Sequence, residues 1–165
     1  MFTKEAGLVP AFLLITPRFY KVPEMLKHLA IALFTLLPSF VFAGGYEPQK
    51  VVYHINYGDE SRIGHTFANM ANHVNELGEE NVDIKAVIHG EAIEYFMSAV
   101  EDSAKQGAID TLKFMGVDFV ICGNSLTGYK ITYKDLYDVE QDDVVKAGLP
   151  EIVRLQQQGY IYVRP

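Results

Sequence analysis

A regular alternation of strand-like and helix-like patterns is the feature that most restricts how this chain can fold. Apolar runs rich in β-branched and aromatic residues predict strands at residues 50–56, 81–89, 117–122 and 160–163. Helical spacing or start signals mark the segments between them, at residues 61–77, 91–100, 103–115, from 132 and from 150. This order predicts one α/β domain with a mostly parallel sheet and helices on both faces.

The helix expected after the first strand has the clearest pattern. Its apolar residues recur three or four positions apart and form one stripe, at Ile63, Phe67, Met70, Val74 and Leu77. Asp59 or Ser61 can cap its N-terminus, and Gly78 is placed to end it.

Two further helix starts are marked by their local chemistry. Thr132–Asp135 resembles a capping box and predicts a short helix. Pro150 is suited to the first turn of the last helix, in which we expect Ile152, Val153 and Leu155 to face inward.

The N-terminal segment has the layout of a secretory signal peptide. Lys27 and His28 precede a short apolar run, Leu29–Leu37, and Val41-Phe42-Ala43 supplies a small-x-small cleavage site. We expect residues 25–43 to be removed after Ala43, with no stable membrane insertion afterwards, and the domain at 44–165 to be periplasmic or secreted. Met25 is a better start than Met1, which makes residues 1–24 an N-terminal extension. A retained N-terminal anchor is the alternative.

Charge and composition exclude several classes of function. Residues 1–43 hold four of the 14 basic and two of the 21 acidic residues, which leaves ten and 19 and a net charge of −9 for the mature chain. With no basic cluster, nucleic acid and anionic membranes are not expected partners.

The cysteine and histidine content argues against metal and nucleotide chemistry. A single cysteine excludes an internal disulfide and any zinc site built from several cysteines. His65 and His73 are eight residues apart, which does not align them as a ligand pair on a helix. The chain has no glycine-rich phosphate loop. We therefore expect no metal or other cofactor.

Cys122 stands where a buried strand ends, and Gly123-Asn124 predicts a turn directly after it. A thiol at such an exit is either a reactive group or a small core side chain. Ligands of open parallel sheets bind at the carboxyl ends of the strands, where the strand order reverses. If the first and third strands flank that reversal, Asn56 and Cys122 face one crevice, with His89 nearby.

Four segments give the chain a resemblance to a known family: Val52–Asn56, Val87–Gly90, Val120–Leu126 and Leu149–Tyr160. With these motifs the chain resembles the DsrE/DsrF-like family. The resemblance implies a flavodoxin-like α/β fold that assembles into homotrimers or homohexamers. In sulfur-relay members, the cysteine that matches Cys122 carries sulfur as a persulfide. Those members are cytoplasmic, whereas this chain has an export signal.

The residues around Cys122 suggest individual roles. Only a thiolate attacks sulfane sulfur, and N–H groups of Gly123 and Asn124, or a nearby helix N-terminus, can lower the thiol pKa. His89 is a candidate proton donor or acceptor, or a histidine satisfied by a backbone carbonyl. We assign Asn56 as a hydrogen-bond donor at the site and His54 as its half-buried neighbour.

Two hypotheses follow from these residues. The first is an exported sulfur-handling protein, at most a sulfurtransferase, whose Cys122 exchanges sulfur with a donor or acceptor protein or a small sulfur compound. The second is a non-catalytic oligomeric module with a structural cysteine that binds a small ligand or a partner. Tyr160 and Tyr162 are expected at a subunit interface or in the core.

Overall fold

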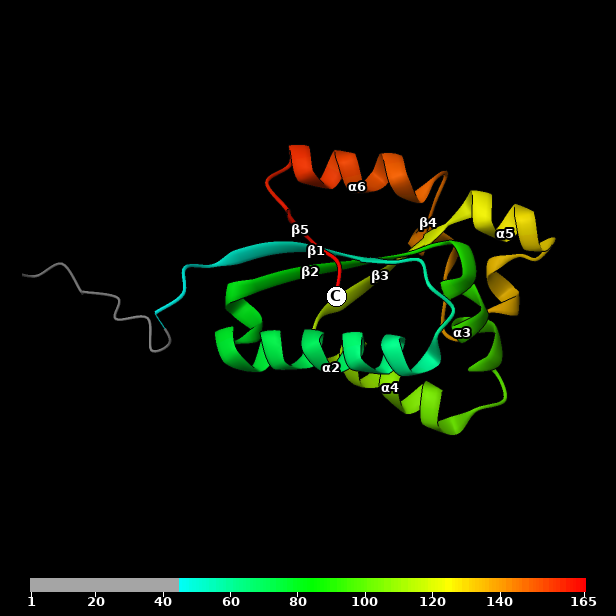
Figure 1. Cartoon of the computed structure of the whole chain (residues 1–165), viewed down its shortest axis with the longest axis horizontal. Helices are drawn as coiled ribbons and strands as arrows, with labels where there is room; N and C mark the ends of the chain where they lie inside the picture. Colours follow the sequence, from blue (N-terminus) through cyan, green and yellow to red (C-terminus); the bar gives the residue numbers. More distant parts are fainter. Residues whose placement is uncertain (1–44) are drawn as a thin grey trace, which may run out of the picture. The chain divides into compact units, whose positions relative to one another are not determined.

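Five parallel strands form the central sheet of the computed structural model, which describes residues 45–165 (Figure 1). They are β1 (Gln49–Ile55), β2 (Val82–Ile88), β3 (Val117–Cys122), β4 (Val144–Val145) and β5 (Ile161–Val163). Their order across the sheet is β4-β3-β2-β1-β5, and every neighbouring pair is parallel. The predicted α/β class with a mostly parallel sheet is confirmed.

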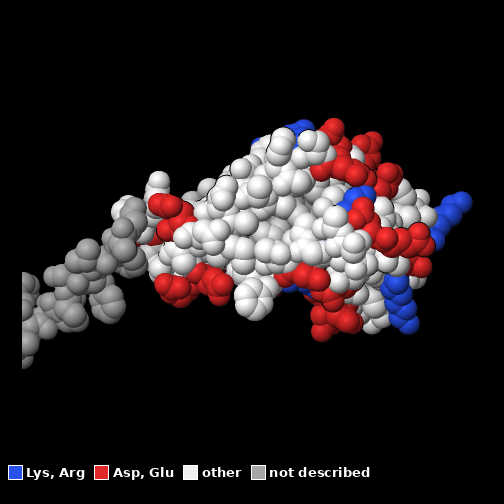
Figure 2. Space-filling view, turned by 90° about the horizontal axis from the view of Figure 1, so that it is seen from below, with Lys and Arg blue, Asp and Glu red and all other residues white. Residues whose placement is uncertain are grey.

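Helices cover both faces of this sheet, as predicted. They are α2 (Glu60–Leu77), α3 (Ile93–Ser98), α4 (Ser103–Phe114), α5 (Gly123–Tyr129) and α6 (Gly148–Gln157), with four short 3₁₀ helices, η1 (Glu79–Asn81), η2 (Gly90–Ala92), η3 (Tyr133–Asp135) and η4 (Gln141–Asp143). Figure 1 shows α6 on one side of the sheet and α2 and α4 on the other. The face seen in Figure 2 carries Asp and Glu in several groups, while its Lys and Arg stand apart from one another.

Alternate residues of β1 fill two separate cores because neighbouring side chains of a strand point to opposite faces. Val51, Tyr53 and Ile55 belong to the larger core under α2, α3 and α4. Val52 belongs to a smaller core with Val87, Ile152, Leu155 and Tyr160, beneath α6. Both faces of the strand are therefore buried, and β1 lacks the polar alternation of a half-exposed strand.

Helix α2 has the predicted stripe and caps. Ile63, Phe67, Met70 and Val74 are buried, and the Asp59 carboxylate accepts the Arg62 N–H at 2.6 Å. Gly78 ends the helix with φ +85°, a conformation that suits glycine. The capping box at Thr132 is also present, since the Asp135 carboxylate accepts both the N–H and the hydroxyl of Thr132.

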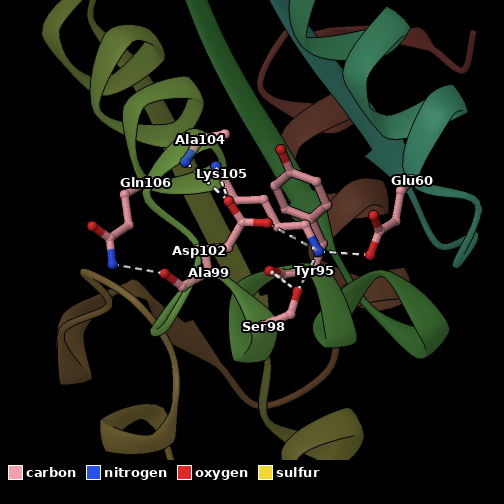
Figure 3. Close-up of polar contacts among 8 residues, drawn as sticks. All are labelled: Glu60, Tyr95, Ser98, Ala99, Asp102, Ala104, Lys105 and Gln106. Carbon is pink, nitrogen blue, oxygen red and sulfur yellow. Dashed lines mark hydrogen bonds and ion pairs between the residues drawn. The ribbon is translucent and has the colours of Figure 1, made fainter.

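A partly buried lysine of α4 contacts both α2 and α3 on the side of the sheet away from α6. The ammonium of Lys105 lies 2.6 Å from Glu60 Oε1 and 2.7 Å from Ser98 Oγ, and 5.2 Å from the centroid of the Tyr95 ring (Figure 3). The Lys105 side chain is only 12% exposed. Glu60 belongs to α2, and Ser98 and Tyr95 both belong to α3, so this one side chain of α4 ties the three helices together.

Several predicted elements differ in detail. The helix expected at 91–100 is a 3₁₀ turn followed by the short α3, and no turn separates β3 from α5, which begins at Gly123. Helix α6 starts at Gly148, two residues before Pro150, and Val153 is 53% exposed where we expected it to face inward. Strand β4 was not predicted, because two residues are too few to carry a period.

The reversal of strand order also differs from the prediction. It falls between β1 and β5, whereas β2 separates β1 from β3. The reason is that β2, β3 and β4 follow β1 in one direction, and only the crossover through α6 returns the chain to the other side of β1.

The predicted signal peptide at 25–43 and the extension at 1–24 lie outside the described residues and stay predictions. In the described part of the chain, no helix is both long enough and apolar enough to cross a membrane.

Candidate functional site

The parallel register brings the ends of β1, β2 and β3 into one row. Ile55 pairs with Ile88, and Ile88 pairs with Ile121, so Asn56, His89 and Cys122 each follow a paired residue at the same edge of the sheet. Strand β5 pairs with β1 on its other side, which adds the residues that follow Val163 to this edge. Four strands thus contribute to one candidate site.

Two histidine rings meet at the centre of this edge. The Nε2 atoms of His54 and His89 lie 2.6 Å apart, within hydrogen-bond distance. The ring centroids are 4.8 Å apart and the planes differ by 19°, so the nitrogens are much closer than the ring centres. The rings therefore point edge to edge, and one of them must donate its N–H to the other.

Tyr162 extends this pair toward the surface. Its hydroxyl lies 2.7 Å from Nδ1 of His54, and its side chain is 41% exposed whereas His54 is 7% exposed. Both ring nitrogens of His54 are thus engaged, one with Tyr162 and the other with His89. The result is a continuous row of hydrogen bonds from the surface to His89.

Both imidazoles are held neutral at neutral pH. Burial, followed by the charges of His89 and Arg164, lowers the pKa of His54 to about 4. Burial and the Arg164 charge also lower the pKa of His89. A neutral pair suits the 2.6 Å contact, because two imidazolium rings would place two N–H groups against each other.

Cys122 lies beside this pair under the N-terminus of α6. Its side chain is 6% exposed, and its Sγ accepts the N–H of Gly148 at 3.2 Å. A Cβ added to Gly148 would stand 3.3 Å from Cys122 Cβ and 3.4 Å from His89 Cβ. The side chains of Cys122 and His89 therefore start from neighbouring positions, and only a glycine fits between them without displacement.

The surroundings favour the thiolate form of Cys122. Burial raises the pKa of the thiol, but hydrogen bonds from the Ser125 hydroxyl and from backbone N–H groups of Gly148, Ser125 and Asn124 outweigh it, and the pKa lies below its ordinary value. The first N–H groups of α6 also carry the positive end of the helix dipole. Ser125 in turn accepts the N–H of Gly90 at 2.9 Å, which ties α5 to the end of β2.

The segment after β5 completes the site. Arg164 donates to the side-chain oxygen of Asn56 at 2.6 Å. Arg62 of α2 donates to the carbonyl oxygen of Pro165 at 2.7 Å and lies 3.9 Å from the centroid of the Tyr57 ring. These contacts hold a guanidinium near both histidines, and Arg164 has no carboxylate partner among residues 45–165.

Comparison with known proteins agrees with this architecture. The sequence model of the DsrE/DsrF-like family matches residues 49–165, most of the chain and all five strands. The chain belongs to the DsrE/DsrF-like family. No curated protein matches this DsrE/DsrF-like chain.

Solved structures that resemble this DsrE/DsrF-like protein include two proteins of unknown function. MTH1491 from Methanobacterium thermoautotrophicum, a protein of unknown function, is 33% identical with a TM-score of 0.62; the match covers 71% of this chain and 99% of MTH1491. BT1422 from Bacteroides thetaiotaomicron, a conserved protein of unknown function, is 13% identical with a TM-score of 0.47, over 71% of this chain and 95% of BT1422. The flavodoxin-like fold expected from the resemblance is confirmed.

The candidate site of this DsrE/DsrF-like protein brings together most of the predicted residues. His54, His89, Asn56 and Cys122 lie at one edge, but Asn56 accepts the hydrogen bond from Arg164, whereas we expected it to donate. The Asn124 N–H donates to the Lys146 carbonyl at 3.2 Å. Their roles in binding or catalysis stay predictions.

Gly123 has a structural reason of its own. A Cβ at this position would stand 3.0 Å from the Val145 carbonyl oxygen of β4, tighter than most Cβ contacts in proteins. The close approach of the two strands thus favours glycine directly after Cys122. Its predicted part in ligand binding is untested.

Sequence reasoning missed four residues of the candidate site: Ser125, Gly148, Tyr162 and Arg164. Tyr162 was expected at a subunit interface or in the core; it is 41% exposed and its hydroxyl binds His54, and the interface stays a prediction. Its position in the last strand was the available signal, because that strand pairs with the strand that carries His54. Among the described residues, no group of three or more His, Cys, Asp or Glu side chains is placed to hold a metal ion.

Proposed function

We propose that this protein handles sulfur as an exported persulfide carrier, with Cys122 as the acceptor. The observation that supports this most is the N–H of Gly148, the first residue of α6, which donates to the Cys122 Sγ at 3.2 Å. That contact favours a thiolate, and a thiolate is the nucleophile in sulfur exchange.

Loading of Cys122 needs no external oxidant, because the donor already holds sulfane sulfur. The Cys122 thiolate attacks the outer sulfur of a donor persulfide, R–S–SH. A bond forms between Sγ and that sulfur while the donor S–S bond breaks, and the electron pair leaves with R–S⁻, which takes up a proton. Unloading is the reverse reaction with an acceptor thiol.

Intact mass measurement tests this proposal directly. The purified mature domain, incubated with polysulfide or thiosulfate, is expected to gain one or more sulfur atoms, and a reductant is expected to remove them. The chain holds one cysteine, so Cys122→Ser is the matched control and should gain nothing. Equal gain in both proteins, or gain in neither, would contradict the proposal.

Export and oligomerisation belong to the same proposal. Cleavage after Ala43 predicts a mature protein that begins at Gly44 in the periplasm or outside the cell, and the family resemblance suggests a homotrimer or homohexamer. Its partners would be a sulfur donor and an acceptor, each a protein or a small sulfur compound. N-terminal sequencing of the protein from its own cell and sedimentation analysis would test the two points separately.

The low exposure of Cys122 favours a second candidate function. A side chain only 6% exposed suits a structural thiol in a non-catalytic oligomeric module that binds a small ligand or partner. This alternative predicts that iodoacetamide reacts slowly with the native protein and quickly after unfolding. Rapid alkylation of native Cys122 would exclude it.

A further inference from the structure

Three side chains form one unbroken row of hydrogen bonds that ends beside the thiol. The Tyr162 hydroxyl lies 2.7 Å from His54 Nδ1, and His54 Nε2 lies 2.6 Å from His89 Nε2. A ring with both nitrogens bonded can accept a proton on one side while it releases another on the opposite side. Such a row can move a proton without any member carrying a lasting charge.

The two ends of the row differ in their surroundings. Tyr162 is 41% exposed, so the outer end of the row lies at the surface. At the other end, Nδ1 of His89 has no protein partner in the described part of the chain, where no buried side-chain nitrogen or oxygen lacks one. His89 is half-buried, and its side chain starts next to Cys122 across Gly148.

We propose that Tyr162, His54 and His89 form a proton relay between solvent and the sulfur that reacts at Cys122. The relay rests on the proposed function, because it serves sulfur exchange at this thiol. His89 is the member that meets the reacting sulfur, and His54 and Tyr162 act through it as positioning and proton-conducting residues.

The relay gives each half of the exchange cycle its proton. During loading, His89 Nδ1–H protonates the departing R–S⁻, His54 Nε2–H passes to His89 Nε2, and the Tyr162 proton passes to His54 Nδ1. Solvent then restores the tyrosine hydroxyl. Every hydrogen bond of the row then runs in the opposite direction, and Nδ1 of His89 is unprotonated.

Unloading returns the row to its starting state. An acceptor thiol must lose a proton before it attacks the persulfide, and the bare Nδ1 of His89 accepts it. The protons then move outward through His54 to Tyr162, which releases one to solvent. Loading and unloading thus invert the same row in opposite directions, and each imidazole stays neutral, as its lowered pKa requires.

The dependence of rate on the leaving group tests the relay without persulfide. Cys122 is reacted with two disulfides: one releases an alkyl thiolate, which needs a proton near neutral pH, and the other an aryl thiolate of much lower pKa, which does not. Each reaction forms one S–S bond and breaks one. The variants are Tyr162→Phe and, should it not fold, His54→Gln.

Loss of the relay should affect only the alkyl disulfide. Tyr162→Phe is expected to slow that reaction about tenfold or more and to leave the aryl reaction unchanged. Tyr137→Phe is the matched control, since its hydroxyl binds Asp110 of α4 on the side of the sheet away from α6, and both rates should stay at wild-type values.

Each other outcome has a definite meaning. Equal slowing of both reactions assigns Tyr162 a structural role, and no slowing of either removes it from the reaction. A wild-type thiol that reacts with neither disulfide leaves nothing for a relay to serve. All three overturn the relay. If Tyr162→Phe slows only the alkyl reaction but the protein gains no sulfur from polysulfide, the persulfide-carrier proposal fails and the relay stands. If the protein gains sulfur but Tyr162→Phe does not distinguish the two disulfides, the relay fails and the carrier proposal stands.

Discussion

The Sγ of Cys122 accepts the first N–H of α6, from Gly148, at 3.2 Å. The residue that ends β3 therefore caps a helix that begins 26 positions later in the chain. The same glycine also lies between the Cβ atoms of Cys122 and His89, so one backbone position both donates to the thiol and separates it from the histidine.

Adding a methyl group at position 148 should disturb both the packing around Cys122 and the protonation of its thiol. Gly148→Ala places a Cβ 3.3 Å from Cys122 Cβ and 3.3 Å from Val87 Cγ1, so neighbouring atoms must shift. We expect a loss of about 1–2 kcal/mol in the free energy of unfolding and a higher pKa of Cys122. Urea unfolding and the pH dependence of alkylation measure the two effects. Gly107→Ala on α4, with open space around its Cβ, is the control and should gain stability.

The reactivity of Cys122 should rise at lower pH than that of an ordinary thiol. Its hydrogen bonds lower the pKa despite burial, so the midpoint of iodoacetamide reaction against pH is expected below the value of the unfolded chain. Ser125→Ala should move the midpoint upward. Thr127→Ala in the same helix, whose hydroxyl donates to the Gly123 carbonyl, should not. Identical midpoints in folded and unfolded protein would contradict the hydrogen-bonded thiolate.

Acid should destabilise the fold through the histidine pair. The pKa of His54 falls from its ordinary 6.5 to about 4, so the unfolded state binds more protons between these values. The contribution of neutral His54 to the free energy of unfolding is therefore fully present above pH 6.5, and it is lost as the pH falls toward about 4. His54→Gln should reduce this acid-induced loss of unfolding free energy by about 1–3 kcal/mol, measured by urea unfolding at several pH values. His65→Gln, on the exposed face of α2, should leave the acid-induced loss unchanged.

Removing the lysine in Figure 3 should loosen the side of the sheet away from α6. Lys105→Ala leaves Glu60 and Ser98 without their shared partner, and we expect a loss of about 2 kcal/mol in the free energy of unfolding. Lys134→Ala at an exposed position is the matched variant and should change stability little. Similar losses in both would show that the contacts of Lys105 contribute no more than an isolated surface charge.

The fold could be predicted because its signals are periodic and local. The stripe from Ile63 to Val74, the cap at Asp59 and the buried run before Cys122 each specify an element within a few residues. The sheet order could not be predicted, since it depends on which side of β1 the last strand joins, and that choice is made by α6 packing onto Val52 and Val87.

The candidate site was half visible in the sequence. The sequence indicated three of its residues, because Asn56, His89 and Cys122 each stand at the end of an apolar run. Tyr162 and Arg164 did not, because their importance comes from pairing across more than a hundred residues, with partners 108 positions away in both cases. Gly148 carries no signal at all until its neighbours are known.

The place of β5 at the far end of the described chain sets the order in which the site can be assembled. A growing polypeptide contains Cys122, His54 and His89 well before Tyr162 and Arg164 are synthesised. Until then the imidazole pair has neither its outer hydroxyl nor the guanidinium beside it. This edge is therefore completed only after β5 has been synthesised, and a chain that stops at Gly159 retains its thiol but lacks the groups that complete the site.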